Sequence, residues 1–323
     1  MKSRLKIILL LAGLTIGGGV IWMLVQNKPA RMAAAIANYE LSLDAYAQTD
    51  TTITEVTNRE HADGRKAGLI SAFFGLDNAL PEGVSDRVVC KGAGGADGMP
   101  VIFSHEVDIE TLEPGDFKIT QASGTAGKVS CLTLAPADDL GELRTALLAG
   151  EYGSAEDQPV MVEIIGDVLS LDGTINFKGT SIVVTPLEDG PTLVWAEIVP
   201  RERWNLGSEG TFLAFGGGTG CPAETEQIVL VTWNGGVTKP GGAPAGNEER
   251  DRYKISVLGD DGLKTNITPF ALADLNDGDN NHKLCLDTAA AVSAVTFPAG
   301  YLTDPREDLN PETTVVPTDL VQD

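Results

Sequence analysis

Positive charge is scarce in this sequence. Its 323 residues contain 23 Lys and Arg against 46 Asp and Glu, which gives a formal net charge of -23 at pH 7. A chain with this charge repels the phosphate backbone of DNA and RNA instead of binding it. The composition therefore excludes nucleic acid as a partner.

The motifs of common catalytic sites are also missing. No G-x-S-x-G nucleophile elbow is present, and neither Gly-rich stretch, KGAGGADG or FGGGTGC, has the pattern of a phosphate-binding loop. These absences disfavour serine hydrolase and nucleotide chemistry. Paired acids of the glycosidase kind stay open, because 46 carboxylates form many spatial pairs that a sequence does not show.

Histidine is rare, with three in the chain: His61, His105 and His282. His105 lies on the apolar side of an alternating segment, so we expect a hydrogen-bonded core residue. His61 has Glu60 and Asp63 beside it and is either a metal ligand or part of a solvated loop. The loop is the favoured interpretation, because neighbouring residues of one segment rarely converge on a metal.

Long apolar runs are absent except near the start of the sequence. Residues 7–25 (IILLLAGLTIGGGVIWMLV) follow three basic residues and are long enough to cross a bilayer as a helix. This pattern predicts export, with the rest of the chain outside the cytoplasm. We predict an anchor that contacts the membrane through residues 7–27. A cleaved signal peptide, with A-x-A triplets at 35–37 and 45–47, is the alternative and would give a secreted protein.

Cysteine is limited to four residues, and no C-x-x-C pair occurs. An even number of cysteines in an exported chain is more often structural than catalytic. With a domain boundary near residue 190, we expect Cys90 to pair with Cys131 and Cys221 with Cys285. Four buried free thiols are the alternative, and the wide spacing disfavours zinc.

Alternating segments separated by Gly, Asp and Pro predict an all-β protein. Residues 101–109 (VIFSHEVDI) alternate between apolar and polar side chains, as in a half-buried strand. Further candidate strands are 117–121, 128–134, 143–148, 160–165 and 181–185, then TLVWAEIV, TEQIVLVTW, DRYKISV, NHKLCLD and AVSAVTF. Many short strands at this spacing are typical of a sandwich or barrel. Residues 67–83 are apolar and are expected to form a short helix or lead-in.

The sequence divides into five successive segments. Residues 1–27 are the signal anchor or signal peptide, and 28–68 are a partly helical stalk. Residues 69–190 and 191–302 are expected to form two β-sandwich domains. Residues 303–323 are acidic and contain Pro, so we expect a mobile tail.

The run DGMPVIFSHEVDIETLEPGDFKITQASGTAGKVSCLTLAPADD, continuing to VMVEIIGDVLSLDG, has a recognisable order of strands and turns. Its characteristic positions are Phe103-Ser104, Val107-Asp108, Thr111-Leu112, 117–119 and 160–173. Over about residues 97–188 the sequence resembles the bacterial Ig-like domains of surface-layer and adhesion proteins. The resemblance implies an Ig-like β-sandwich and no catalytic residues, and it departs from the pattern at the polar insertion GEYGSAEDQ.

Oxygen-bearing side chains are dense in the segment ALADLNDGDNNHKL. Calcium takes six to eight oxygen ligands, so this segment is a candidate calcium site in an exported acidic protein. The candidate ligands are Asp274, Asn276, Asp277, Asp279 and Asn281, with Asn280 among them. The segment does not match the EF-hand pattern. A plain turn is the alternative, because Asp, Asn and Gly tolerate turn backbone angles.

These features together predict an extracytoplasmic binding or adhesion protein of the cell envelope, with a protein or glycan as its unknown ligand. The alternative is a secreted or periplasmic hydrolase that acts on carbohydrate through paired carboxylates, and a structural spacer comes third. A cleft with converging carboxylates under an aromatic rim would favour the enzyme. Trp195, Trp204 and Trp233 would either form a sugar-stacking platform or pack in the core.

Overall fold

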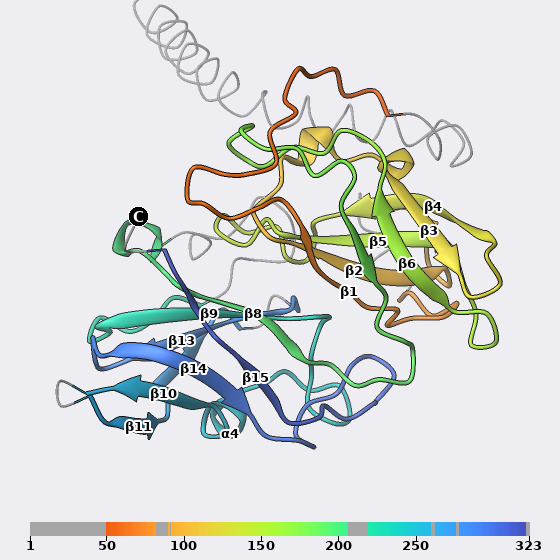
Figure 1. Cartoon of the computed structure of the whole chain (residues 1–323). Helices are drawn as coiled ribbons and strands as arrows, with labels where there is room; N and C mark the ends of the chain where they lie inside the picture. The colour runs from red at the N-terminus through yellow and green to blue at the C-terminus, as the bar shows by residue number, and fades with distance from the viewer. Residues whose placement is uncertain are drawn as a thin grey trace, which may run out of the picture.

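The computed structural model describes residues 50–81, 90, 92–205, 219–259, 262–275 and 278–320. Strands dominate these residues and form two groups of sheets, coloured orange to green and green to blue in Figure 1. No helix within these ranges is long and apolar enough to cross a membrane. The predicted anchor (1–27) and residues 28–49 of the predicted stalk lie outside the described residues.

Among the described residues, seven strands form the first domain. In chain order they are β1 (Leu69–Ala72), β2 (Asp97–Phe103), β3 (Phe117–Gln121), β4 (Ala126–Thr133), β5 (Thr145–Glu151), β6 (Pro159–Ile164) and β7 (Ser181–Val183), with 3-10 turns at Ile109–Thr111 and Pro114–Asp116. They pair antiparallel in the order β1-β2-β5-β4-β3-β6-β7. Phe73, directly after β1, and Thr185, after β7, form a parallel bridge. The two edges of the sheet therefore meet, and the sheet wraps around one core.

Aromatic side chains fill this core. Phe103 at the end of β2 packs edge to face on Phe117 and on Phe177, with ring centroids 6.4 and 4.9 Å apart. The alternation in residues 101–109 predicted a longer strand, but β2 ends at Phe103. Ser104 Oγ donates to Lys66 O and accepts from the backbone of Gly68, which turns the chain out of the sheet.

The segment 67–83 is not helical in its described part. Residues 69–72 form β1, in which Leu69 lies opposite Phe103 and Ala72 opposite Val101. A short apolar run has no periodicity that separates a buried strand from a buried helix. The expectation of a helix there is corrected by this pairing with β2.

Residues 50–68, predicted to be part of a stalk, pack along the first domain. The backbone of Asn176 donates to Asn58 O at 2.8 Å, and its side chain donates to Val56 O at 3.0 Å. Ala67 is buried in the core of the domain. This stretch therefore belongs to the folded domain and does not extend away from it.

The described part of the second domain contains nine strands. They are β8 (Leu193–Ile198), β9 (Gln227–Trp233), β10 (Lys254–Leu258), β11 (Lys264–Ile267), β12 (Ala271–Ala273), β13 (Asn281–Leu286), β14 (Ala291–Phe297), β15 (Thr313–Val315) and β16 (Thr318–Asp319), with a 3-10 turn at Arg201–Arg203 and the short helix α4 at Asn247–Arg250. One sheet has the order β11-β10-β14-β15 and the other β12-β13-β9-β8-β16. Side chains of both sheets, such as Trp233 and Phe297, share one core.

The five-stranded sheet is covered on both faces. Every residue of β13, and every residue of β9 after Gln227, is buried. One face packs on the four-stranded sheet, and part of the other faces the first domain (Figure 1). This arrangement explains why NHKLCL, a segment with polar residues, is buried throughout.

The predicted mobile tail from residue 303 is part of the second domain up to residue 320. β15 pairs with β14, and β16 pairs in parallel with β8. The buried side chain of Asn310 accepts from the backbones of Tyr301 and Leu302 and donates to Pro298 O and Pro311 O. An acidic, Pro-containing composition predicted disorder, but these hydrogen bonds and strand pairings fix the segment.

Two disulfides are present, in the pairing expected from the sequence. Cys90 is bonded to Cys131 with a Cα–Cα distance of 5.6 Å, and Cys221 to Cys285 with 5.8 Å. Each bridge lies within one domain.

Candidate functional site

A buried ion pair joins the two domains. Arg144, just before β5, places Nη2 2.7 Å from Glu197 Oε2 on β8, and the two side chains are 3% and 0% exposed. Arg203 of the second domain extends the pair, with Nη1 3.5 Å from Glu197 Oε1 and Nη2 3.0 Å from Glu106 Oε2. Four charged side chains of alternating sign therefore cross the domain boundary.

Trp195 on β8 supports this group. Its indole Nε1 donates to Glu197 Oε2 at 3.0 Å. The guanidinium of Arg144 lies 4.8 Å from the centre of its ring, and that of Arg65 lies 5.6 Å away. Stacking on an aromatic face suits the planar guanidinium, so the tryptophan orients both arginines.

A cavity of about 430 Å³ opens beside these residues. Its volume falls within the range of small-molecule sites. Most of the lining residues carry polar side chains, and they come from both domains: His61, Arg65, His105, Glu106, Arg144, Ser170, Leu171, Asp172, Arg203 and Leu320. We call it the polar cavity.

Two histidines and two aspartates cluster at one wall of the polar cavity, which His61, His105 and Asp172 line directly. His61 Nδ1 lies 3.0 Å from Asp63 Oδ2, and His61 Nε2 lies 3.0 Å from Asp172 Oδ2. His105 Nε2 is 3.6 Å from the same Asp63 oxygen, and its Nδ1 is 2.9 Å from Ser104 Oγ. The two imidazole rings are 5.0 Å apart. The fold thus joins residues from three separate stretches of the chain.

The charges of this wall follow from its surroundings. Burial, with the nearby charge of Arg65, lowers the pKa of His105 to about 4. Burial opposes ionisation of Asp63, but hydrogen bonds and charge from Arg65 outweigh it and lower its pKa to about 2. Burial also opposes ionisation of Asp172, yet hydrogen bonds from Ser170 and Thr174 hold its pKa well below the usual range. At neutral pH the wall carries a neutral His105 and two carboxylates.

The structure refines both expectations for these histidines. His105 is buried, as the sequence predicted, but its ring also reaches the polar cavity. His61 was interpreted as part of a solvated loop. It contacts Asp172, a residue 111 positions away, and Asp63.

A second buried ionic cluster crosses the boundary at Lys283 on β13. Its Nζ lies 3.0 Å from Glu142 Oε1 of the first domain and 3.2 Å from Asp274 Oδ1. Burial and the proximity of the two carboxyl groups raise the pKa of Asp274, and burial raises that of Glu142. These carboxyls converge, but they are enclosed by protein and neither lines the polar cavity.

The candidate calcium ligands have protein partners where they are described. Asp274 binds Lys283, and the two oxygens of Asp279 accept from the backbone and the side chain of Asn281. Asn281 Oδ1 accepts from Thr232. Asn276 and Asp277 lie outside the described residues. Calcium binding by this segment stays a prediction.

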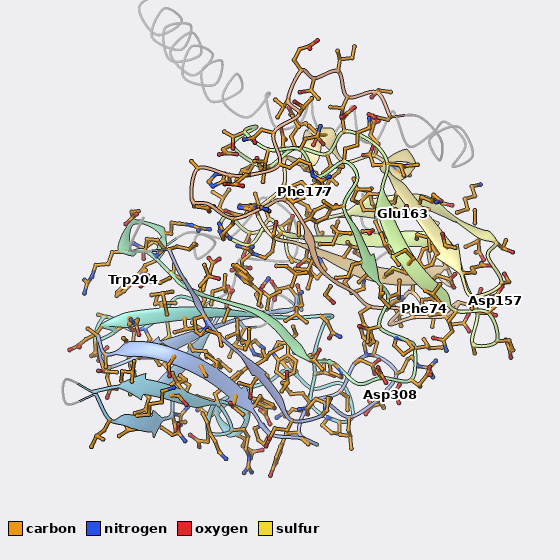
Figure 2. The ribbon with its side chains drawn as sticks, viewed as in Figure 1. Phe74, Asp157, Glu163, Phe177, Trp204 and Asp308 are labelled. Atoms are coloured by element: carbon orange, nitrogen blue, oxygen red, sulfur yellow. A yellow bond between two sulfur atoms is a disulfide. The ribbon has the colours of Figure 1, made fainter. Side chains whose placement is uncertain are left out.

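The three candidate sugar-stacking tryptophans lie in different environments. Trp233 is fully buried and donates to the Tyr253 hydroxyl. Trp204, labelled in Figure 2, donates to Val199 O and lies under the guanidinium of Arg201. Trp195 belongs to the buried ion group. The structure therefore gives each ring a separate structural partner.

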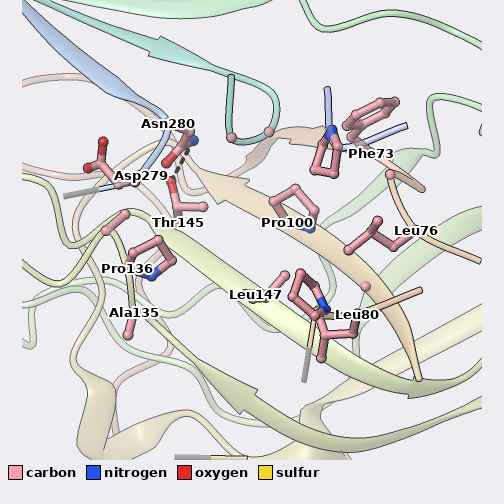
Figure 3. Close-up of a pocket in the computed structure, with 18 of the residues that line it drawn as sticks. Phe73, Leu76, Leu80, Pro100, Ala135, Pro136, Thr145, Leu147, Asp279 and Asn280 are labelled. Atoms are coloured by element: carbon pink, nitrogen blue, oxygen red, sulfur yellow. Dashed lines mark hydrogen bonds between the residues drawn. The ribbon is translucent and has the colours of Figure 1, made fainter. Parts of the chain in front are cut away.

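A second cavity, of about 190 Å³, lies on the same domain boundary and is apolar (Figure 3). Phe73 and Pro100 of the first domain face Gly235 of the second. Leu76, Leu80, Leu134, Pro136 and Leu147 complete most of the apolar wall. At one end, Asn280 Nδ2 donates to Thr145 Oγ1 at 3.2 Å, the dashed line in Figure 3. We call it the apolar cavity.

No sequence motif marks Arg65, Arg144 and Arg203, which line the polar cavity. Their spacing has no pattern, because they belong to different segments that meet only in the fold. No local signal separates them from the rest of the chain's 23 basic residues, because the positions they take in the fold are not readable from their segments.

Comparison with known proteins gives little guidance. No protein family model and no curated protein sequence matches the chain. A crystal structure of the S-layer protein rSbsC(31-844) and a structure of surface layer protein SbsC, domains 1-6, are similar to it at 12% identity and a TM-score of 0.27. Each match covers 74% of this chain and 42% of the other. A TM-score this low establishes neither a shared fold nor a shared function.

Proposed function

We propose that the protein is exported, is attached to the membrane through residues 7–27, and uses two Ig-like β-sandwich domains to bind a glycan at the cell envelope. The apolar run at 7–25 after three basic residues supports export. The two disulfides support it as well, because such bonds persist in oxidising compartments.

The polar cavity is the observation that carries the binding role. Both domains line it, and its guanidinium, imidazole, hydroxyl and carboxylate groups offer donors and acceptors in one space. A sugar hydroxyl is both a donor and an acceptor, so a saccharide can satisfy both kinds of group. Arg203 supplies the wall of the second domain and is held by Glu106. A ligand in this cavity would therefore touch both domains.

The full chain, purified in detergent, should be screened on a panel of immobilised envelope saccharides and then titrated by calorimetry. Arg203→Gln should weaken binding about tenfold or more, as expected for loss of a charged hydrogen-bond donor. Arg201→Gln is the matched control, since Arg201 lies on the same turn but stacks on Trp204. Absence of any bound saccharide, or equal affinity of both variants and the parent, would contradict the proposal.

A carbohydrate hydrolase is the second candidate, because Glu106 and Asp172 both line the polar cavity. Binding ranks first for a chemical reason. Glycosidic cleavage needs one protonated carboxyl, whereas the pKa of Asp172 is held low and Glu106 is paired with Arg203. Release of reducing sugar by the parent, and its loss in Glu106→Gln, would favour the hydrolase.

A further inference from the structure

We infer that His61, Asp63 and His105 form a binding site for a divalent transition metal, with zinc as the best match. The inference goes beyond the proposed glycan binding, because metal binding can be measured whether or not the polar cavity holds a saccharide. The three residues come from the loop before β1 and from the turn after β2.

The spacing of the ligand atoms suits a tetrahedral ion. One ligand atom from each of the three residues lies within 4.8 Å of the others. Asp63 Oδ2 is 3.0 Å from His61 Nδ1 and 3.6 Å from His105 Nε2. Zinc bonds of about 2.0 to 2.2 Å at tetrahedral angles separate neighbouring ligand atoms by about 3.3 to 3.5 Å. Only small side-chain adjustments are needed.

His105 provides an independent observation. The residue is 6% exposed, and its Nε2 is a buried atom with no hydrogen-bond partner among the described residues. Ser104 Oγ donates its proton to Lys66 O, so we assign the proton of the His105 imidazole to Nδ1, which donates to Ser104 Oγ. Nε2 then directs a lone pair towards a carboxylate oxygen. A cation between these two acceptors would give Nε2 the partner that it lacks.

In each imidazole, the nitrogen that would not bind the metal already makes a hydrogen bond. His61 Nε2 donates to Asp172 Oδ2, and Asp172 is fixed by hydrogen bonds from Ser170 and Thr174. His61 Nδ1 faces Asp63, where it accepts from the backbone N–H at 3.3 Å and lies 3.0 Å from Oδ2, so a bound metal would replace that long hydrogen bond. Metal-binding histidines almost always donate their second nitrogen to a carboxylate, a backbone carbonyl or water. His61 with Asp172 has this arrangement, and His105 has the analogous one with Ser104.

Arg65 defines which side of Asp63 is accessible. Its Nε and Nη2 donate to Asp63 Oδ2 at 2.7 and 2.6 Å. The guanidinium keeps this carboxylate ionised, and the metal would take the side of the oxygen that faces the two histidines. Three protein ligands leave one coordination position for water or another ligand, as in zinc sites that exchange a ligand. Since both histidines line the polar cavity, that position opens into it.

The test uses the full chain after treatment with a chelator, with Co²⁺ as the spectroscopic probe and Zn²⁺ as its competitor. One equivalent of Co²⁺ should produce the visible bands of a tetrahedral complex, and one equivalent of Zn²⁺ should remove them. His61→Gln and His105→Gln should abolish these bands. His282→Gln is the matched control, because the third histidine of the chain lies in the second domain against Tyr253 and its loss should leave the spectrum unchanged.

Asp172→Asn separates metal binding from folding, since this side chain is 47% exposed and its replacement preserves its size. It should weaken Zn²⁺ binding on the order of 10- to 100-fold, as for other outer-shell carboxylates, while the circular dichroism spectrum stays that of the parent. The opposing arrangement is a His61 held between Asp63 and Asp172 by hydrogen bonds alone, with no metal. Absence of a tetrahedral Co²⁺ spectrum in the parent, or its persistence in His61→Gln or His105→Gln, would overturn the inference.

Discussion

The polar and the apolar cavity lie on the same domain boundary but are built in different ways. The polar cavity is bordered by ion pairs such as Arg144 with Glu197, whose partners come from opposite domains. The apolar cavity is bordered by Phe73, Leu80 and Pro100, with few polar groups. Ionic contacts demand defined distances and angles, whereas apolar contacts depend mainly on buried area. We therefore expect the polar side to determine how the domains are oriented.

Close approach on the apolar side depends on a glycine. A Cβ at Gly235 would lie 3.0 Å from Phe73 Cδ1, a distance that forces one of the two groups to move. The absence of a side chain at Gly235 thus lets the second domain reach the ring of Phe73. The apolar side accommodates its partner by shape, and the polar side by charge.

The largest expected effect comes from breaking the polar side. Arg144→Met leaves Glu197 as a buried charge without its closest partner, so we expect the free energy of unfolding to fall by about 3 to 5 kcal/mol. Urea denaturation measures this loss. The control is Lys118→Met, which breaks an exposed pair with Glu163 and should cost about 0 to 1 kcal/mol. Equal losses in the two variants would remove the distinction between buried and exposed pairs.

Shortening a side chain on the apolar side should cost somewhat less. Leu80 is buried beside the Cys90–Cys131 disulfide, and Leu80→Ala should lower the free energy of unfolding by about 2 to 4 kcal/mol through lost burial and a larger cavity. Leu140→Ala, at an exposed leucine, should change it by less than about 0.5 kcal/mol. If Leu80→Ala lowers the free energy of unfolding as little as Leu140→Ala does, the surrounding residues close the enlarged apolar cavity without cost.

The buried acids predict a pH dependence. Burial and the nearby charge of Asp279 raise the pKa of Glu142 from 4.5 to about 7. The folded state therefore binds a proton that the unfolded state lacks between about pH 4.5 and 7, and this group's contribution to stability falls as the pH rises through that window. His105 and His282, with pKa values lowered to about 4, act in the opposite direction.

Glu142→Gln isolates this group from the histidines. From pH 4.5 to 7, the free energy of unfolding of the parent should fall relative to that of the variant by on the order of 1 to 2 kcal/mol. One pKa unit corresponds to about 1.4 kcal/mol, and the full shift is reduced because Asp274 shares the change of charge. Thermal unfolding at several pH values measures the difference. A difference that stays constant with pH would contradict the raised pKa of Glu142.

The smallest expected effect is that of calcium on the segment 274–281. Because Asp274 and Asp279 already have protein partners, millimolar Ca²⁺ should stabilise the protein on the order of 1 kcal/mol, following the mass-action relation for a weak ligand. Differential scanning calorimetry with Ca²⁺ and with Mg²⁺ tests this, and Asp277→Asn should remove the Ca²⁺ shift. If Ca²⁺ shifts the melting temperature equally in parent and variant, or does not shift it in the parent, the segment is a plain turn.

Local patterns carried most of what the sequence predicted correctly. The segment 117–121 coincides with β3, because alternation with period two is a property of each strand alone. The cysteine pairing followed from a boundary between domains. The prediction of a mobile tail was wrong for residues 303–320, since their order depends on pairing with β14 and with β8, which lies far earlier in the chain.

The candidate sites depend on contacts that no local pattern reports. His61 and Asp63 were noticed as neighbours, but the residues that complete the cluster, His105 and Asp172, are 44 and 111 positions from His61. The same holds for the pair Arg144 and Glu197, which joins two domains. Such groups become visible only when the path of the chain is known.

Strands β8 and β16 lie side by side and run in the same direction, with Thr318 opposite Glu197 and Asp319 opposite Ile198. The chain enters β8 from the first domain and leaves β16 at its last residue, and because the strands are parallel these two points lie at opposite ends of the pair. Tension between the first domain and residue 320 would therefore pull the two strands along their length in opposite directions and load their hydrogen bonds in shear, all at once. Forced unfolding is governed by the rate of unfolding. The short β8–β16 pair should therefore determine how long the second domain stays folded under mechanical load.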